Sequence, residues 1–239
     1  MTTLFISDLH LSEENPQILQ LFSNFLRNEA QQAETLYILG DLFEVWLGDD
    51  AIPAFAETVI SDLRQLTQQG VPVYLMVGNR DFLLGERFAE LTGTKLLPDP
   101  SVIDLYGTQT LLMHGDTLCT DDTDYQAFRQ QVRNPAWQEM FLAKSIEERI
   151  AIGKQARVES KARTQEKSEE IMDANPNEIV HVMREHGVTR LIHGHTHRPA
   201  IHSLQLNNQT AERIVLGDWY HQGSVLRVTQ NSTELATIS

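Results

Sequence analysis

The sequence predicts an α/β fold, with parallel strands and crossover helices toward the amino end and antiparallel strands toward the carboxyl end. Three observations predict it. Short apolar runs bounded by polar residues recur in residues 1–80, segments with apolar residues at helical spacing separate these runs, and residues 200–239 hold only strand-like runs. A chain of 239 residues is long enough for one large domain around a substantial core, with room for an insertion.

The amino-terminal part of the chain predicts the order strand, helix, strand, helix, strand. Each strand is a short apolar run, and the first helix starts at Pro16, a residue favoured in the first turn of a helix. This alternation is typical of parallel strands joined by crossover helices. The predicted strands are 3–7, 35–39 and 71–77, and the predicted helices are 16–31 and 52–69.

The rest of the chain predicts a less regular order. A short helix, a strand pair that turns at Gly107, a long helical stretch, one more helix and one more strand precede the antiparallel tail. Gly187 ends the last of these helices. The predicted helices are 85–91 and 176–186, the long helical stretch is 122–173, and the strands are 102–106, 110–113 and 189–193. The predicted tail strands are 201–206, 213–217, 224–228 and 234–238.

Residues 121–170 differ from the rest of the chain in charge. They hold nine of the 19 lysines and arginines and ten of the 33 aspartates and glutamates, so this segment is nearly neutral. The remaining ten basic and 23 acidic residues leave a charge of −13 on the rest. The segment also has no strand signal. We therefore interpret 122–173 as a helical insertion, expected to act as a lid, within a single domain that spans 1–239.

Composition and charge exclude several classes of function. A net charge of −14 leaves too few lysines and arginines to neutralise nucleic-acid phosphates, so no nucleic-acid partner is expected. No apolar run is long enough to span a bilayer, and the amino end lacks the pattern of a signal peptide. The single cysteine, Cys119, cannot form an internal disulfide, which favours a reducing, cytosolic compartment. We expect Cys119 to be a buried, inert thiol.

A polar cluster directly follows each of five predicted strands. Since ligands bind at the carboxyl ends of the strands in α/β sheets, the five clusters are expected to converge on one site. Their aspartate, histidine and asparagine side chains are oxygen and imidazole donors without a thiolate, which indicates a centre for Mn, Fe, Zn or Co. The clusters are DLH at 8–10, GDLFE at 40–44, GNRD at 78–81, HGD at 114–116 and GHTH at 194–197.

Three histidines lie at alternate positions in LIHGHTHRP, residues 191–199. Residues two apart on an extended chain point the same way, so His195 and His197 are expected to reach a metal ion from one side. His193 still belongs to the apolar strand. We interpret it as a packed histidine with a satisfied ring nitrogen and exclude it from the ligand set.

In this order, DLH, GDLFE, GNRD, MHGD and GHTH resemble the five sequence blocks of the calcineurin-like metallophosphoesterases, and they span residues 8–197. The resemblance implies two packed mixed β-sheets flanked by helices, and a site with two Mn²⁺ ions. It assigns one ion to Asp8, His10, Asp41 and His197, and the other to Asp41, Asn79, His114 and His195, with Asp41 bridging the two.

Longer stretches narrow the resemblance within this family. LYILGDLFEVWLGDD, GNRDFLLGERF, HGDTLCTDD and LIHGHTHRPA resemble the UDP-2,3-diacylglucosamine diphosphatases of the lipid A pathway. This implies hydrolysis of the diphosphate of UDP-2,3-diacylglucosamine by water attack on the uridine-side phosphorus, giving UMP and 2,3-diacylglucosamine 1-phosphate. It also implies a monomer that binds the cytoplasmic face of the inner membrane peripherally.

Position 80 departs from the pattern of the wider family. Many relatives have a histidine there, thought to protonate the leaving group, whereas this chain has Arg80. A guanidinium stays charged, so it is a poor proton donor but a good clamp on phosphate. A phosphate leaving a diphosphate needs no acid, since its second pKa is about 6. Arg80 therefore favours anhydride cleavage over monoester hydrolysis, and we expect Arg80, Asn79 and His195 to act in catalysis.

Part of the helical insertion is expected to bind substrate. Residues 157, 160, 164 and 167 are spaced to lie on one helical face, which is most often a solvated face. The resemblance implies substrate contacts there instead, and adds Asp122 and three residues of the site. The full predicted set is Asn79, Arg80, Asp122, Arg157, Ser160, Thr164, Lys167 and His195.

The run 137–152 places its apolar side chains near one helical face. This face is interpreted either as packing of the insertion onto the main domain or as a surface for acyl chains. Two other functions stay open: a relative acting on a soluble nucleotide diphosphate or phosphodiester, and a scaffold that has lost catalysis. All seven ligand positions are filled, which disfavours the scaffold. The apolar residues of the run are Trp137, Met140, Phe141, Ile146 and Ile150.

Overall fold

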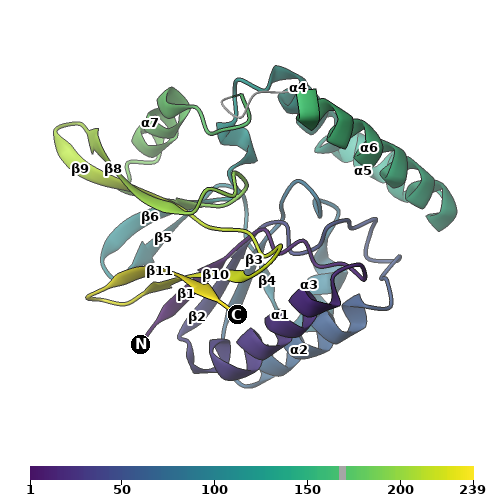
Figure 1. Ribbon diagram of the computed structural model, residues 1–239, viewed down its shortest axis with the longest axis horizontal. Helices are drawn as coiled ribbons and strands as arrows, with labels where there is room; N and C mark the ends of the chain where they lie inside the picture. Colours follow the sequence, from purple (N-terminus) through teal and green to yellow (C-terminus); the bar gives the residue numbers. More distant parts are fainter. Residues whose placement is uncertain (167–170) are drawn as a thin grey trace.

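The computed structural model describes residues 1–166 and 171–239, with the backbone alone at 159–166. Two mixed β-sheets pack against each other, helices cover their outer faces, and three further helices lie apart from these layers (Figure 1). The predicted fold class, two packed mixed sheets flanked by helices, is therefore confirmed.

The first sheet has the strand order β11-β10-β1-β2-β3-β4. Strands β1 to β4 are parallel, whereas β10 and β11 are antiparallel to their neighbours. Helices α1, α2 and α3 cover one face of this sheet (Figure 1). The bounds are β1 Thr3–Ile6, α1 Pro16–Asn28, β2 Thr35–Leu39, α2 Ala56–Gln68, β3 Val73–Met76, α3 Glu86–Thr92, β4 Lys95–Leu96, β10 Gly223–Val228 and β11 Thr233–Ile238.

The second sheet has the strand order β5-β6-β7-β9-β8. Strands β6, β7 and β9 are parallel, and each edge strand is antiparallel to its neighbour. Helix α7 packs on the outer face, where its apolar residues join those of β6 and β7. The bounds are β5 Ser101–Leu105, β6 Thr108–Met113, α7 Pro176–Glu185, β7 Arg190–His193, β8 Ala200–Leu206 and β9 Gln209–Val215.

Strand β1 explains why the central strands are apolar throughout instead of alternating. Phe5 faces the second sheet, in a cluster with Leu112 and Ile192. Leu4 and Ile6 belong to the cluster on the opposite face, which includes the apolar residues of α1 and α2. Both faces of the strand are buried, which is typical of parallel strands covered on two sides.

Two differences from the predicted elements have local causes. Strand β4 was not predicted, because two exposed residues are too few to produce a periodic pattern. Helix α2 starts at Ala56 rather than at 52, because a turn precedes it in which Ala56 N donates to Pro53 O at 2.9 Å. Neither difference moves a ligand-bearing loop.

The prediction that 137–152 forms one helical face is wrong. Helix α5 (Pro135–Leu142) ends before α6 (Ile146–Glu166) begins. Ser145 interrupts the run, because its Oγ accepts from Glu148 N at 3.2 Å while Glu148 Oε2 accepts from Ser145 N at 3.0 Å. This reciprocal pair is a capping box, and the letters SIEE at 145–148 contain its signature.

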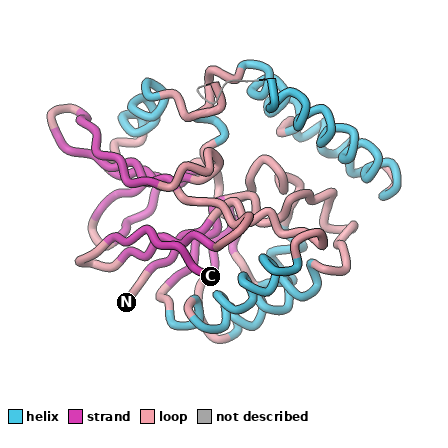
Figure 2. Tube along the Cα trace, in the orientation of Figure 1, coloured by secondary structure: helices cyan, strands magenta, loops and turns pink. Residues whose placement is uncertain are grey.

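The helical insertion contains α4 (Thr123–Val132), α5 and α6, and its described residues form no strand (Figure 2). Trp137 stacks on Phe141 and lies near Phe82 of the main domain, with ring centroids 5.1 and 6.3 Å apart. Ile146 and Ile150 are instead exposed. No helix within the described ranges is long and apolar enough to cross a bilayer.

Trp219 is expected to contribute most to the core beside α1. It is fully buried, packs edge-on against Phe22 and Phe25, and its Nε1 donates to Ser224 O at 3.1 Å. Trp219→Ala should lower the free energy of unfolding by about 3–5 kcal/mol, measured by urea denaturation. Trp137→Ala, in the insertion, serves as control and should cost less. Equal losses would contradict this role of Trp219.

Candidate metal centre

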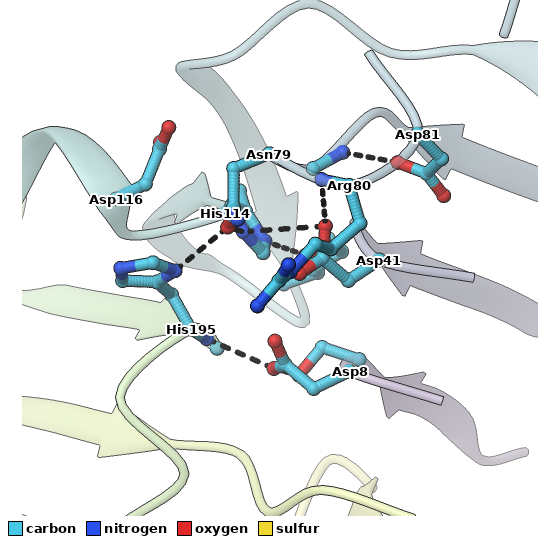
Figure 3. Close-up of polar contacts among 12 residues, drawn as sticks. Asp8, Asp41, Asn79, Arg80, Asp81, His114, Asp116 and His195 are labelled. Carbon is cyan, nitrogen blue, oxygen red and sulfur yellow. Dashed lines mark hydrogen bonds and ion pairs between the residues drawn. The ribbon is translucent and has the colours of Figure 1, made fainter. Parts of the chain in front are cut away.

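All seven predicted metal ligands lie together where the two sheets meet. The first sheet supplies those that follow β1, β2 and β3, and the second sheet supplies those that follow β6 and β7. Figure 3 shows five of them around one point. The first sheet contributes Asp8, His10, Asp41 and Asn79, and the second contributes His114, His195 and His197.

One group of donor atoms consists of Asp8, His10 and His197, with Asp41 nearby. His10 Nε2 and His197 Nε2 face each other at 3.4 Å, and His197 Nε2 lies 3.3 Å from Asp8 Oδ1. Asp41 Oδ2 is 3.9 Å from His10 Nε2. Ligands bound about 2.0–2.2 Å from one ion lie roughly 3 Å or more from each other. These separations therefore fit a shared cation.

The second group surrounds Asn79. Its Oδ1 lies 2.9 Å from both His114 Nε2 and His195 Nδ1 (Figure 3). Asp41 Oδ1 lies 3.8 Å from His114 Nε2, while its other oxygen faces His10 of the first group. Asp41 thus stands between the two groups, the place that a bridging ligand would occupy.

The electrostatics of the site favour positive charge. Asp8, Asp41 and His114 are almost completely buried. Burial by itself lowers the pKa of His114, but the carboxylates of Asp41 and Asp8 raise it to about 9. Burial by itself raises the pKa of Asp8, yet the hydrogen bond from His197 and the charge of His114 hold it well below its usual range. The raised pKa of His114 reports the negative potential of the buried carboxylates, and the same potential favours a metal cation at this point.

The ligand residues adopt an unusual backbone conformation. Asp8, His10, Asp41, His195 and His197 have φ values of 55°, 50°, 53°, 68° and 53°, in the left-handed region. For a residue other than glycine this conformation costs of order 1–3 kcal/mol and tends to occur at functional sites. Here it turns each side chain sharply out of its strand direction and toward the common point.

Two glycines leave the space that these carboxylates occupy. A Cβ at Gly78 would collide with the Asp41 side chain, and a Cβ at Gly194 would collide with Asp8 and Ser7. Ser7 Oγ and His195 N both donate to Asp8 Oδ2, at 2.6 and 2.9 Å. The close approach of the loops is what brings donors to the buried carboxylates.

Asp81 ties together two of the ligand loops and was not predicted as a site residue. Its Oδ1 accepts from Gly78 N at 2.7 Å, and its Oδ2 accepts from Leu42 N and Phe43 N at 2.7 and 3.3 Å. In the same region Arg80 N donates to Asp41 Oδ1 at 2.8 Å (Figure 3). The place of Asp81 in the GNRD block was the only available signal.

Glu44 and Asp218 stand behind the histidines of the first group and were also missed. Glu44 Oε2 lies 2.9 Å from His10 Nδ1, and Asp218 Oδ2 lies 3.6 Å from His197 Nδ1. Carboxylates in such positions orient metal-binding histidines. Glu44 also forms an ion pair with Arg157 of α6 at 3.2 Å, which connects the helical insertion to the site.

His193 and Cys119 were predicted to be a packed histidine and a buried, inert thiol, and the structure agrees. His193 is fully buried, its Nδ1 is 2.8 Å from Gly194 O, and Arg213 Nε donates to its Nε2 at 2.9 Å. Both ring nitrogens are therefore occupied. Cys119 is buried, which raises the pKa of its thiol to about 12 and makes the reactive thiolate scarce.

An apolar cavity of about 270 Å³ opens beside the candidate centre. Asn79 and Arg80 form part of its polar lining, and the Arg80 guanidinium has no hydrogen bond or ion pair with any side chain that the structure describes. Loops of the main domain and helices of the insertion supply the apolar wall. That wall consists of Val45, Trp46, Leu47, Phe82, Leu83, Phe128, Val132, Trp137, Phe141, Ile152 and Ala156.

The structure shows the side chains of only some of the predicted substrate residues outside the ligand set. Asp122 and Arg157 line the cavity, and Asp122 Oδ1 also accepts from Tyr125 N at 3.1 Å as the cap of α4. Ser160 and Thr164 lie on α6, where only the backbone is described. Lys167 lies outside the described residues.

Gly78→Ala is expected to weaken the binding of a divalent metal ion, with Mn²⁺ as the probe, about 10- to 100-fold, because the new methyl group displaces the Asp41 carboxylate. Isothermal titration calorimetry measures the affinity. Gly70→Ala is the control, since Gly70 has a φ of 94° but open space around a Cβ. That variant should lose stability through backbone strain and keep its Mn²⁺ affinity. Equal loss of affinity in both would contradict the steric explanation.

The calcineurin-like phosphoesterase family model matches residues 1–199. Three curated relatives named UDP-2,3-diacylglucosamine hydrolase are each 53% identical to this chain. The protein of Xanthomonas axonopodis pv. citri aligns over 100% of both chains, that of Xanthomonas oryzae pv. oryzae (strain PXO99A) over 98% of both, and that of Stenotrophomonas maltophilia (strain R551-3) over 100% of this chain and 99% of its own. The chain therefore belongs to the calcineurin-like phosphoesterase family, among the proteins named UDP-2,3-diacylglucosamine hydrolases.

Proposed function

We propose that this hydrolase cleaves the diphosphate of UDP-2,3-diacylglucosamine. Water attacks the uridine-side phosphorus, and the products are UMP and 2,3-diacylglucosamine 1-phosphate. The position of the apolar cavity carries the proposal: it opens at Asn79 and Arg80, beside the candidate metal centre. A diphosphate at the centre would direct the attached acyl chains into this cavity. The name shared by the curated relatives supports the same substrate.

We further propose two Mn²⁺ ions at the centre, held by the seven predicted ligands. The buried carboxylates and the facing ring nitrogens support a cation in each group. Divalent ions in such sites neutralise charge on phosphoryl oxygens and favour the ionisation of water. Asn79 Oδ1 lies 2.9 Å from a ring nitrogen of both His114 and His195, so these three donor atoms would reach one ion. Asp8 fixes the backbone of His195 through the hydrogen bond to its N.

Arg80 is proposed to clamp the diphosphate. Its guanidinium makes no hydrogen bond or close ion pair with a described side chain, and Arg80 lines the cavity next to Asn79. A planar guanidinium binds two phosphate oxygens at once and keeps its charge throughout. It therefore stabilises the negative charge that develops on the phosphoryl group, whereas the leaving sugar phosphate departs without a proton from the protein.

The helical insertion is proposed to bind the substrate as well. Asp122, Arg157, Ser160, Thr164 and Lys167 are proposed to contact the substrate. The presence of Asp122 and Arg157 in the lining of the cavity supports the first two. Arg157 would exchange its ion pair with Glu44 for a phosphate or sugar oxygen.

We also propose that the insertion acts as a lid and that the protein is a monomer bound peripherally to the cytoplasmic face of the inner membrane. Exposed apolar side chains on the insertion support contact with a lipid surface. They are Phe128, Met140, Leu142, Ile146, Ile150, Ile152, Val158 and Ile171.

Hydrolysis of UDP-2,3-diacylglucosamine in water labelled with heavy oxygen, with Mn²⁺ present, tests the reaction. Label in UMP is the expected result, because it reports attack on the uridine-side phosphorus. Label in the sugar phosphate would keep the substrate and reverse the attack. No turnover with metal bound would contradict the lipid substrate and favour a soluble nucleotide diphosphate, which the same assay can include.

Arg80→Met should lower kcat/KM on the diphosphate about 100- to 1,000-fold, as is typical when a donor to the developing charge is removed. Arg80→His should restore part of this loss and raise hydrolysis of simple phosphate monoesters, because imidazole can donate a proton. Arg184→Met, on the exposed surface of α7, is the control. Unchanged selectivity in Arg80→His would count against the clamp.

A further inference from the structure

One side of α4 faces the loops that carry the predicted metal ligands. Tyr125 Oη donates to Asp116 Oδ2 at 2.6 Å, and Arg129 Nε donates to the same oxygen at 2.7 Å. Arg133, which caps the helix, donates through Nη2 to Gly78 O at 2.8 Å. These three residues are spaced by four, so they lie on one face. That face therefore reaches both the His114 loop and the Asn79 loop.

Asp116 is the residue to which both Tyr125 and Arg129 of α4 donate. It is fully buried, follows His114 by two residues, and its main-chain oxygen accepts from Gln126 Nε2 at 2.8 Å. The ring of Tyr125 also stacks on His195, with centroids 6.0 Å apart and planes inclined by 27°. The Asp116 carboxylate thus connects α4 with the loop that carries His114. Through Tyr125 it also reaches the ring of His195.

Stability alone does not explain why charged side chains make this contact. Withdrawing a carboxylate and a guanidinium from water is costly, and well-packed apolar residues in their place are often as stable. Two short hydrogen bonds to one oxygen do what apolar packing does not: they fix both the distance and the direction of the helix. Arg129 and Arg133 line the cavity while bound to the main domain, so the wall they form follows the ligand loops.

We propose that Asp116 is a positioning residue of the hydrolase. Through Tyr125 and Arg129 it holds α4 against the ligand loops and so sets the distance between the cavity wall and the reacting groups. It acts mainly on the position of the helix and is not itself one of the seven predicted metal ligands. The measurement of kcat and KM rests on the proposed function, whereas the measurement of hydrogen exchange in α4 does not.

Asp116→Asn keeps the shape of the side chain and removes its charge. Asp62 of α2 provides a matched control. It is also buried and also accepts from a hydroxyl and a guanidinium, here Ser23 Oγ at 2.6 Å and Arg27 Nη2 at 2.9 Å, both on α1. Hydrogen exchange of residues 123–132, Mn²⁺ affinity by calorimetry, and kcat and KM on UDP-2,3-diacylglucosamine are measured for both variants.

In Asp116→Asn we expect faster amide exchange in α4, a Mn²⁺ affinity that falls by much less than kcat/KM, and a kcat/KM lower by up to about 100-fold, the effect of a displacement near 1 Å. Asp62→Asn should lose stability and keep all three properties. Unchanged exchange in α4 would overturn the proposal. A loss of Mn²⁺ affinity as large as the loss of kcat/KM in Asp116→Asn would also overturn it, because Asp116 would then act through the ligands themselves.

Tyr125→Phe is the second variant, and it covers the case in which Asp116→Asn does not fold. It removes one of the two hydrogen bonds, so exchange in α4 should rise and kcat/KM should fall by less than in Asp116→Asn. The double variant should be no worse than Asp116→Asn, since both changes break one unit. Additive effects would overturn the proposal. If the natural chain fails to turn over the lipid substrate, the proposed function fails, and amide exchange still decides the role of Asp116.

Discussion

The burial of two carboxylates at the junction of the sheets is the constraint on which the rest of the structure depends. Asp8 and Asp41 are withdrawn from water, and a buried charge is costly unless opposite charge and hydrogen-bond donors surround it. Histidines from both sheets and main-chain N–H groups meet this need. The left-handed ligand residues, the space left by Gly78 and Gly194, and the crosslinking by Asp81 all follow from it.

The helical insertion is bonded to the same loops and so extends the site. Asp116 receives donors from α4, and Glu44 pairs with Arg157 of α6. The cavity wall therefore shares its supports with the ligands, and Asn79 and Arg80 belong to both regions. An apolar chain in the cavity and a charged group at the centre would be held by one continuous set of contacts.

Most of the fold could be predicted because its signals are local. Apolar runs of strand length and glycine-containing polar blocks after them indicated the strands and the loops that converge. The break between α5 and α6 was also encoded locally, by Ser145 and Glu148, but the apolar periodicity across it dominated the interpretation. The roles of Asp81 and Asp116 could not be predicted, since each depends on partners that only the tertiary structure brings within reach.

The metal centre combines ligands from nearly opposite ends of the chain: His10 and His197 meet although 187 positions separate them. During synthesis the first strand leaves the ribosome long before its partner loop exists, so Asp8 and His10 cannot form their half of a closed site alone. Domains fold as units as the chain emerges. A metal ion that needs both His10 and His197 can therefore be bound only after residue 197 has been made and its loop has packed against the loop that follows β1.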